Sequence, residues 1–112
     1  MAYLYRGVSA KHPNWFAASM GIVVPGDPNG TITATEHNQG GVEERSPFTS
    51  WTHLVSIAEF HRDKDGPGGL LLRVETTSPQ FEDKWSWQWS PDIYFEQEIL
   101  LRGIRIRVEV IL

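Results

Sequence analysis

Two glutamates near the carboxyl end of the sequence have types and spacing that suit chemistry. Glu96 and Glu98 stand two residues apart, directly before the apolar run Ile99 to Leu101. Residues two apart on a β-strand point to the same face, where two carboxylates repel each other. Such a pair adds nothing to packing, so it favours a role in binding or catalysis, such as stabilising a positively charged group.

Two other polar motifs precede this pair. Arg6 stands inside the N-terminal strand pattern, and Ser50–Trp51–Thr52 stands at an expected strand-to-helix junction. An arginine fork suits a pyrophosphate, and a serine hydroxyl can hold a carboxylate in position. Arginine, hydroxyl and carboxylate together suit cleavage of the glycosidic bond of NAD⁺. Its nicotinamide leaves as a neutral molecule without a general acid, and a single carboxylate can stabilise the cationic ribose.

Several other kinds of site are disfavoured by the sequence. The chain has no cysteine and its four histidines lack H-E-x-x-H spacing, so we expect no metal site. The phosphate-cradling motifs G-x-G-x-x-G and G-x-x-x-x-G-K-[ST] do not occur. Composition leaves a Ser–His–Asp triad open, although no G-x-S-x-G motif marks a nucleophile.

Length and composition indicate one globular domain over residues 1–112, with 40% hydrophobic and 21% charged residues. The net charge of -4 disfavours a duplex-DNA binder. The sequence has no apolar run long enough to span a bilayer and no secretion pattern at its start. We therefore expect no membrane partner and a cytoplasmic site of action.

Hydrophobic periodicity predicts the elements that must position these residues. Residues 104–110 alternate apolar and charged, residues 69–76 form an apolar run, and Thr52 suits the N-cap of a helical pattern. We expect strands over 2–8, 22–24, 69–76 and the closing segment, helices over 13–21 and 49–63, and mainly loops over 25–47 and 77–95. This order predicts an α+β fold with largely antiparallel strands.

The three motifs resemble those of the mono-ADP-ribosyltransferases of the Arg–Ser–Glu class, especially small bacterial toxin domains. "YLYRG" is similar to the family's first-strand arginine motif, and "SPFTSWT" with "SIAEF" to its Ser-Thr-Ser motif and following helix. "FEQEILL" is similar to its Glu-x-Glu motif. Trp51 departs from the threonine that is usual between the two hydroxyl positions. The resemblance spans roughly Tyr3 to Leu112, and it rests on the order and spacing of the motifs together.

The resemblance implies a fold of two packed, mostly antiparallel sheets around an NAD⁺ cleft, with one or two short helices. It implies that Glu98 is the catalytic glutamate, that Glu96 acts on the acceptor side, and that Ser50 supports catalysis. The residues implied to bind NAD⁺ as co-substrate are Arg6, Gly7, Ser50 and Thr52. The implied activity moves ADP-ribose onto a macromolecule and releases nicotinamide. The family further implies a toxin with a neutralising antitoxin or immunity protein.

A row of tryptophans precedes the glutamates. Trp85, Trp87 and Trp89 would share one side if this segment is extended. Tryptophans commonly form a hydrophobic flap on the core, but in the family the loop before the catalytic glutamate recognises the acceptor. We therefore assign this row, together with Tyr94, to acceptor binding. Stacking on indoles suits an RNA base, whereas Glu-x-Glu in the family goes with protein arginine, so both acceptors stay open.

Two other functions stay open on the sequence. In an NAD⁺ glycohydrolase, water would replace the acceptor. In a non-catalytic binding module, the tryptophan-rich loop would hold a ligand. Taken alone, Arg6 suits a strand salt bridge and Ser50 suits helix capping, so only the three motifs together favour catalysis. The sequence also leaves open whether the chain is a free-standing toxin or the tip of a larger delivered one.

Overall fold

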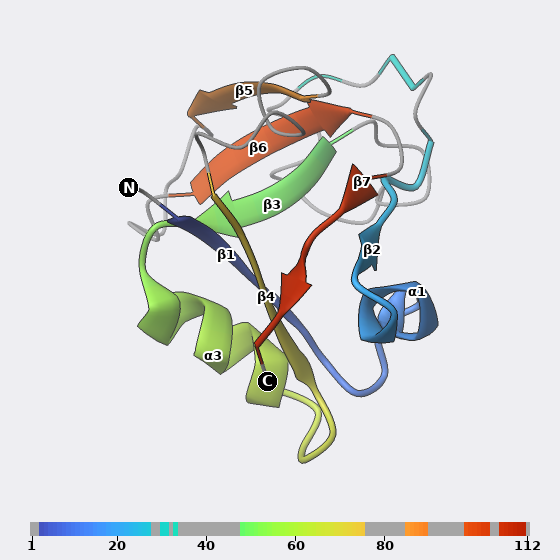
Figure 1. Ribbon diagram of the computed structural model, residues 1–112, viewed down its shortest axis with the longest axis vertical. Helices are drawn as coiled ribbons and strands as arrows, with labels where there is room; N and C mark the ends of the chain where they lie inside the picture. The colour runs from blue at the N-terminus through green and yellow to red at the C-terminus, as the bar shows by residue number, and fades with distance from the viewer. Residues whose placement is uncertain are drawn as a thin grey trace.

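The computed structural model describes residues 3–27, 30–31, 33, 48–75, 85–89, 98–103 and 106–111. The first half of the chain contains β1 (Tyr3–Val8), α1 (Trp15–Ser19), β2 (Ile22–Val23), β3 (Phe48–Thr52) and α3 (Val55–Asp63). The second half contains β4 (Leu70–Glu75), β5 (Trp85–Trp89), β6 (Glu98–Gly103), β7 (Ile106–Arg107) and β8 (Glu109–Val110). Together they form a small α+β domain (Figure 1).

Six strands form one antiparallel sheet in the order β5-β6-β3-β1-β4-β8. β1 pairs with β4 along its whole length, and β3 pairs with β6 in the same way. Between β1 and β3, by contrast, the only paired position in the described residues joins Tyr5 to Thr52. Beyond this position the two strands diverge, as Figure 1 shows. We call this divergence the β1–β3 fork.

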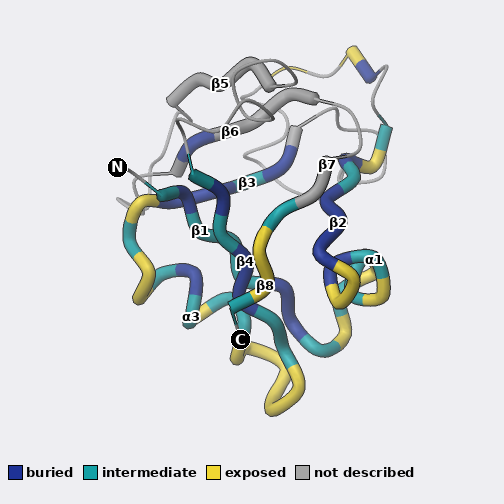
Figure 2. The backbone as a smooth tube through the Cα atoms, viewed as in Figure 1, coloured by how far each residue is buried: buried dark blue, intermediate teal, exposed yellow. Residues whose placement is uncertain are grey.

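One face of the sheet carries the main core. In β1, Leu4 and Val8 point to this face because side chains alternate along a strand, and both are almost fully buried. Helix α1 and strand β2 cover the same face, since Ala18 and Val23 belong to the cluster. The buried cluster consists of Leu4, Val8, Ala18, Val23, Trp51, Leu72, Val74 and Ile99. Figure 2 shows how buried positions concentrate on the strands and exposed ones around the chain turn that follows α3.

Helix α3 lies on the opposite face and contacts the backbone of β1 directly. Gly7 alternates with Leu4 and Val8, so it faces this helix. A Cβ atom at Gly7 would overlap the carbonyl oxygen of Ala58 and stand 2.6 Å from the amide nitrogen of Arg62. Only a glycine allows this approach, so Gly7 fixes the distance between α3 and the sheet.

Several predictions are confirmed, and others need correction. The α+β class, the antiparallel pairing and the strands near residues 3–8 and 70–75 are as expected. Residues 48–52, however, belong to strand β3, and α3 begins only at Val55 with Leu54 as its N-cap. The prediction of Thr52 as N-cap was therefore wrong. The segment 85–89, predicted as loop, is strand β5.

The fold described here is simpler than the resemblance implies. Besides the six-stranded sheet, the described strands pair only in β2 with β7, at two positions. A second packed sheet is therefore not seen among them. In the same part of the chain, none of the helices is long and apolar enough to cross a membrane.

Replacing Gly7 with alanine tests the contact between α3 and β1. We expect Gly7→Ala to lower the free energy of unfolding by about 3 kcal/mol, because the new methyl group meets helix backbone that cannot rotate away. Urea unfolding followed by circular dichroism measures this change. Gly66→Ala is the control, because a Cβ atom at Gly66 would meet open space. Its free energy of unfolding should fall only because alanine disfavours the positive φ of 88° at this position, a cost of about 1–2 kcal/mol. A smaller loss for Gly7→Ala than for Gly66→Ala would contradict this packing.

Candidate functional site

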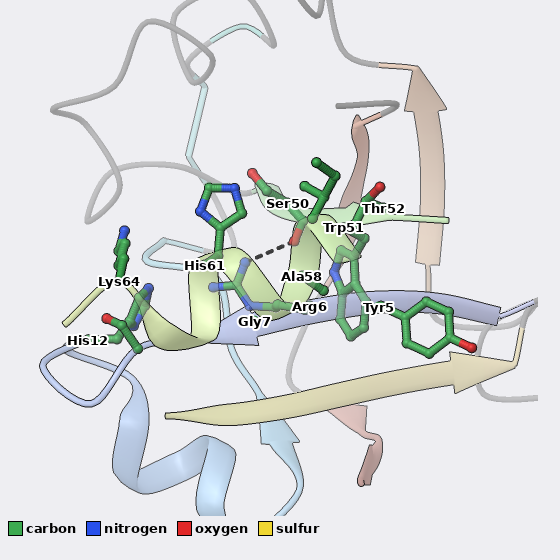
Figure 3. Close-up of a pocket in the computed structure, with 12 residues that line it drawn as sticks. Tyr5, Arg6, Gly7, His12, Ser50, Trp51, Thr52, Ala58, His61 and Lys64 are labelled. Atoms are coloured by element: carbon green, nitrogen blue, oxygen red, sulfur yellow. Dashed lines mark hydrogen bonds between the residues drawn. The ribbon is translucent and has the colours of Figure 1, made fainter. Parts of the chain in front are cut away.

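A pocket of about 250 Å³ lies between β1, β3 and α3 (Figure 3). β1 contributes Arg6 and Gly7 to its walls, and β3 contributes Ser50 and Thr52. Helix α3 closes the other side with Ile57, Ala58, His61 and, directly after its last residue, Lys64. The pocket occupies the β1–β3 fork, where a helix covers the widening gap between two strands of one sheet.

Arg6 connects the two strands at the fork. Its Nη1 donates a hydrogen bond of 3.1 Å to the backbone carbonyl of Ser50, which is 44 residues away in the sequence. Figure 3 shows this bond and the Arg6 guanidinium directed to the same opening as the His61 ring. The first two sequence motifs are thus in direct contact, and the charged group of the first lines the pocket.

The second motif is divided between the two faces of the sheet. Trp51 is only 2% exposed and packs in the core, where its indole N–H donates to the hydroxyl of Thr49 at 2.8 Å. Ser50 and Thr52 alternate with Trp51 along the strand, and all three residues contribute to the pocket lining. A tryptophan between the two hydroxyl residues is therefore explained by core packing.

Thr52 also controls the transition from β3 to α3. Its Oγ1 accepts a hydrogen bond of 3.0 Å from the backbone N–H of Leu54, the N-cap residue of the helix. Thr52 itself is almost fully buried. The hydroxyl therefore fixes where the helix begins and, with it, which helical residues reach the pocket.

The third motif is placed beside the pocket by the pairing of its strand, β6, with β3. Glu98 begins β6 and is paired directly opposite Thr52. Directly opposed positions of an antiparallel pair share a face of the sheet, so position 98 lies on the face of the pocket residue Thr52. The side chain of Glu98, and the whole of Glu96, lie outside the described residues.

The predicted acceptor residues are located only in part. β5 is extended and stands at one edge of the sheet, with Trp87 opposite Leu101 and Trp89 opposite Ile99. The segment is thus extended, which is the condition under which Trp85, Trp87 and Trp89 were predicted to share one side. The side chains of these three residues, and Tyr94 as a whole, lie outside the described part of the structure. Their role in acceptor binding stays a prediction.

Several pocket residues were not among the site residues proposed from the sequence, and those with basic side chains are His12, His61 and Lys64. His61 lies within the helix predicted over residues 49–63, and no functional role was assigned to it. A usable signal existed, because Ile57, His61 and Lys64 have the i, i+4, i+7 spacing of one helix face. His12 offered no such signal, because it reaches the pocket from the turn between β1 and α1.

The described ion pairs with shifted pKa values lie outside the pocket lining. Arg73 on β4 donates hydrogen bonds of 2.7 and 3.0 Å to Glu109 on β8, and they lower the pKa of the Glu109 carboxyl. On α3, hydrogen bonds from Arg62 likewise lower the pKa of Asp63. Within the described ranges, no group of three or more histidine, aspartate or glutamate residues is arranged to bind a metal ion.

Comparison with known proteins adds no relative: no protein-family model, curated protein or solved structure matches the chain.

Removing the hydroxyl of Thr52 tests its role at the start of α3. We expect Thr52→Val to lower the free energy of unfolding by about 1 kcal/mol, because the Leu54 N–H loses its acceptor. The same change should accelerate hydrogen exchange of the Leu54 amide several-fold, as measured by NMR. Ser56→Ala, at an exposed position on α3, is the control and should leave that amide unchanged. Unaltered protection of Leu54 in Thr52→Val would refute this role.

Proposed function

We propose that the protein is a toxin-type, NAD⁺-dependent mono-ADP-ribosyltransferase that transfers ADP-ribose to a macromolecule. One observation carries the proposal. Arg6, Ser50 and Glu98 belong to three neighbouring strands, β1, β3 and β6, and Arg6 and Ser50 are in hydrogen-bond contact beside a pocket. The pairing of these strands places residues from the beginning, middle and end of the chain on adjacent strands of one sheet. Their proximity is what a shared site requires.

In the proposed reaction, Arg6 binds the phosphate oxygens of NAD⁺ and Glu98 contacts the nicotinamide ribose. The bond between ribose C1′ and the nicotinamide nitrogen breaks, and its electron pair leaves with the now neutral nicotinamide. The Glu98 carboxylate stabilises the positive charge on the ribose and holds a ribose hydroxyl. The acceptor then bonds to C1′ and loses its proton to Glu96.

The remaining pocket residues have supporting roles in this proposal. The Ser50 hydroxyl orients the Glu98 carboxylate across the β3–β6 pair, and Gly7 lets α3 lie close to β1, which sets the helix wall of the site. Thr52 forms the wall opposite position 98. The acceptor, an RNA base or a protein arginine, would approach over the β5 side. A neutralising antitoxin or immunity protein would act in the cytoplasm, where the chain would meet its target.

Replacing the third-motif carboxylate tests the chemistry. We expect Glu98→Gln to reduce nicotinamide release from NAD⁺ at least about 100-fold, because the amide cannot stabilise the cationic ribose. Nicotinamide is measured by chromatography, and circular dichroism checks the fold. Glu59→Gln is the matched control. It also replaces a carboxylate with an amide, but Glu59 lies on α3 and does not line the pocket. Full release by Glu98→Gln would rule out the assignment.

Transfer is distinguished from hydrolysis with NAD⁺ labelled in its ADP-ribose portion and added with the protein to a cell lysate. We expect label in macromolecules, and its loss on nuclease or protease treatment identifies RNA or protein as the acceptor. Label found only in free ADP-ribose would instead indicate a glycohydrolase. Absence of nicotinamide release under every condition would indicate a binding module.

A further inference from the structure

The lining of the pocket, as far as the structure describes it, has a charge opposite to that of the chain. The chain has 14 acidic and 10 Lys or Arg residues, a net charge of -4. The described pocket lining nevertheless contains Arg6, His12, His61 and Lys64 and neither aspartate nor glutamate. Basic groups gathered in a concave site raise the local concentration of anions, whatever the net charge of the surface around them.

These basic groups converge from three separate segments. Arg6 comes from β1, His12 from the turn that follows β1, and His61 and Lys64 from the end of α3. Residues three apart on a helical turn are neighbours on its surface, so His61 and Lys64 share one side. Figure 3 shows His61 and Arg6 facing one opening, with His12 and Lys64 toward its far end.

The tautomer of His12 can be deduced from its hydrogen bond. Its Nδ1 lies 3.0 Å from the backbone nitrogen of Asn14, which can only donate. Nδ1 is therefore the acceptor, and the ring proton of His12 is on Nε2. The turn is held by two further backbone bonds of 3.0 Å, from His12 N–H to the Ser9 carbonyl and from Trp15 N–H to the His12 carbonyl. The donor of the His12 ring is therefore its Nε2–H group.

From this lining we infer that the α3 side of the pocket is a diphosphate-binding site in which His12, His61 and Lys64 act together with Arg6. Arginine, lysine and an Nε2-protonated imidazole all donate hydrogen bonds, and phosphate oxygens only accept them. Donors on β1, on the turn and on α3 surround the pocket, an arrangement that suits two linked phosphate groups better than one.

The identity of the natural ligand rests on the proposed function, in which this site would seat the diphosphate of NAD⁺. Held there, the diphosphate would direct the nicotinamide ribose toward β6. Anion binding itself requires neither Glu98 nor any bond cleavage, so it can be measured separately from turnover.

Titration calorimetry of the whole chain with inorganic pyrophosphate tests the inference. We expect saturable binding, weakened about tenfold by His61→Ala and about tenfold by Lys64→Ala, since each removes a hydrogen bond to a charged ligand. His53→Ala and Lys11→Ala are the matched controls, because both residues are exposed and outside the lining; their affinity should equal that of the wild type. Unfolding midpoints check that all four variants are folded.

The outcomes separate this inference from the proposed function. Absence of pyrophosphate binding, or wild-type affinity in both His61→Ala and Lys64→Ala, overturns the diphosphate site even if the protein releases nicotinamide. Binding that depends on His61 and Lys64 supports the site even if NAD⁺ is never cleaved, in which case only the proposed function fails.

Discussion

The site depends on the hydrogen bond between Arg6 and the backbone of Ser50. Where β1 and β3 stop pairing, a side chain of β1 reaches the carbonyl of β3 across the gap. The strands can therefore separate enough to form a pocket while remaining connected. The same bond holds the Arg6 guanidinium at the pocket wall, so one interaction both maintains the fork and orients a charged group.

Helix α3 forms the remaining wall of the pocket. The helix lies on the bare backbone at Gly7, and Thr52 sets its first residue through the Leu54 amide. With its distance and starting point fixed, α3 presents His61 and Lys64 to the pocket. The basic lining is thus a consequence of two local features, a glycine and a threonine hydroxyl, that carry no charge themselves.

The sequence allowed a good part of the fold to be predicted where local patterns decide the structure. Alternation identified β1, and the apolar run identified β4. β3 was missed because its hydroxyl residues resemble a helix cap, and only pairing with β6 makes this segment a strand. Register between distant strands is not a local property, so the opposition of Thr52 and Glu98 could not be predicted from periodicity.

The candidate site was predictable in the same uneven way. Arg6, Ser50 and Thr52 were identified by residue type and order, and they do line one pocket. His12 was not, because a turn brings it there and no spacing rule encodes that turn. His61 and Lys64 lie on the side of α3 that Ile57 marks, so their positions could be predicted from helical spacing although no role was assigned to them. The resemblance predicted a cleft between two packed sheets. Among the described strands the pocket instead lies at the β1–β3 fork, within one sheet and under α3.

The central claim is that Arg6, Ser50 and Glu98 serve one ligand site at the β1–β3 fork. NMR titration of the labelled protein with ADP-ribose tests this directly, because amide shifts report where a ligand binds. The account predicts that the largest shift changes occur at Arg6 and Ser50, across the strand pair at Glu98, and on the side of α3 that carries His61. Shift changes confined to the opposite face, around the exposed Phe16 of α1 and the exposed Met20 directly after it, would contradict it, as would no change at millimolar ADP-ribose.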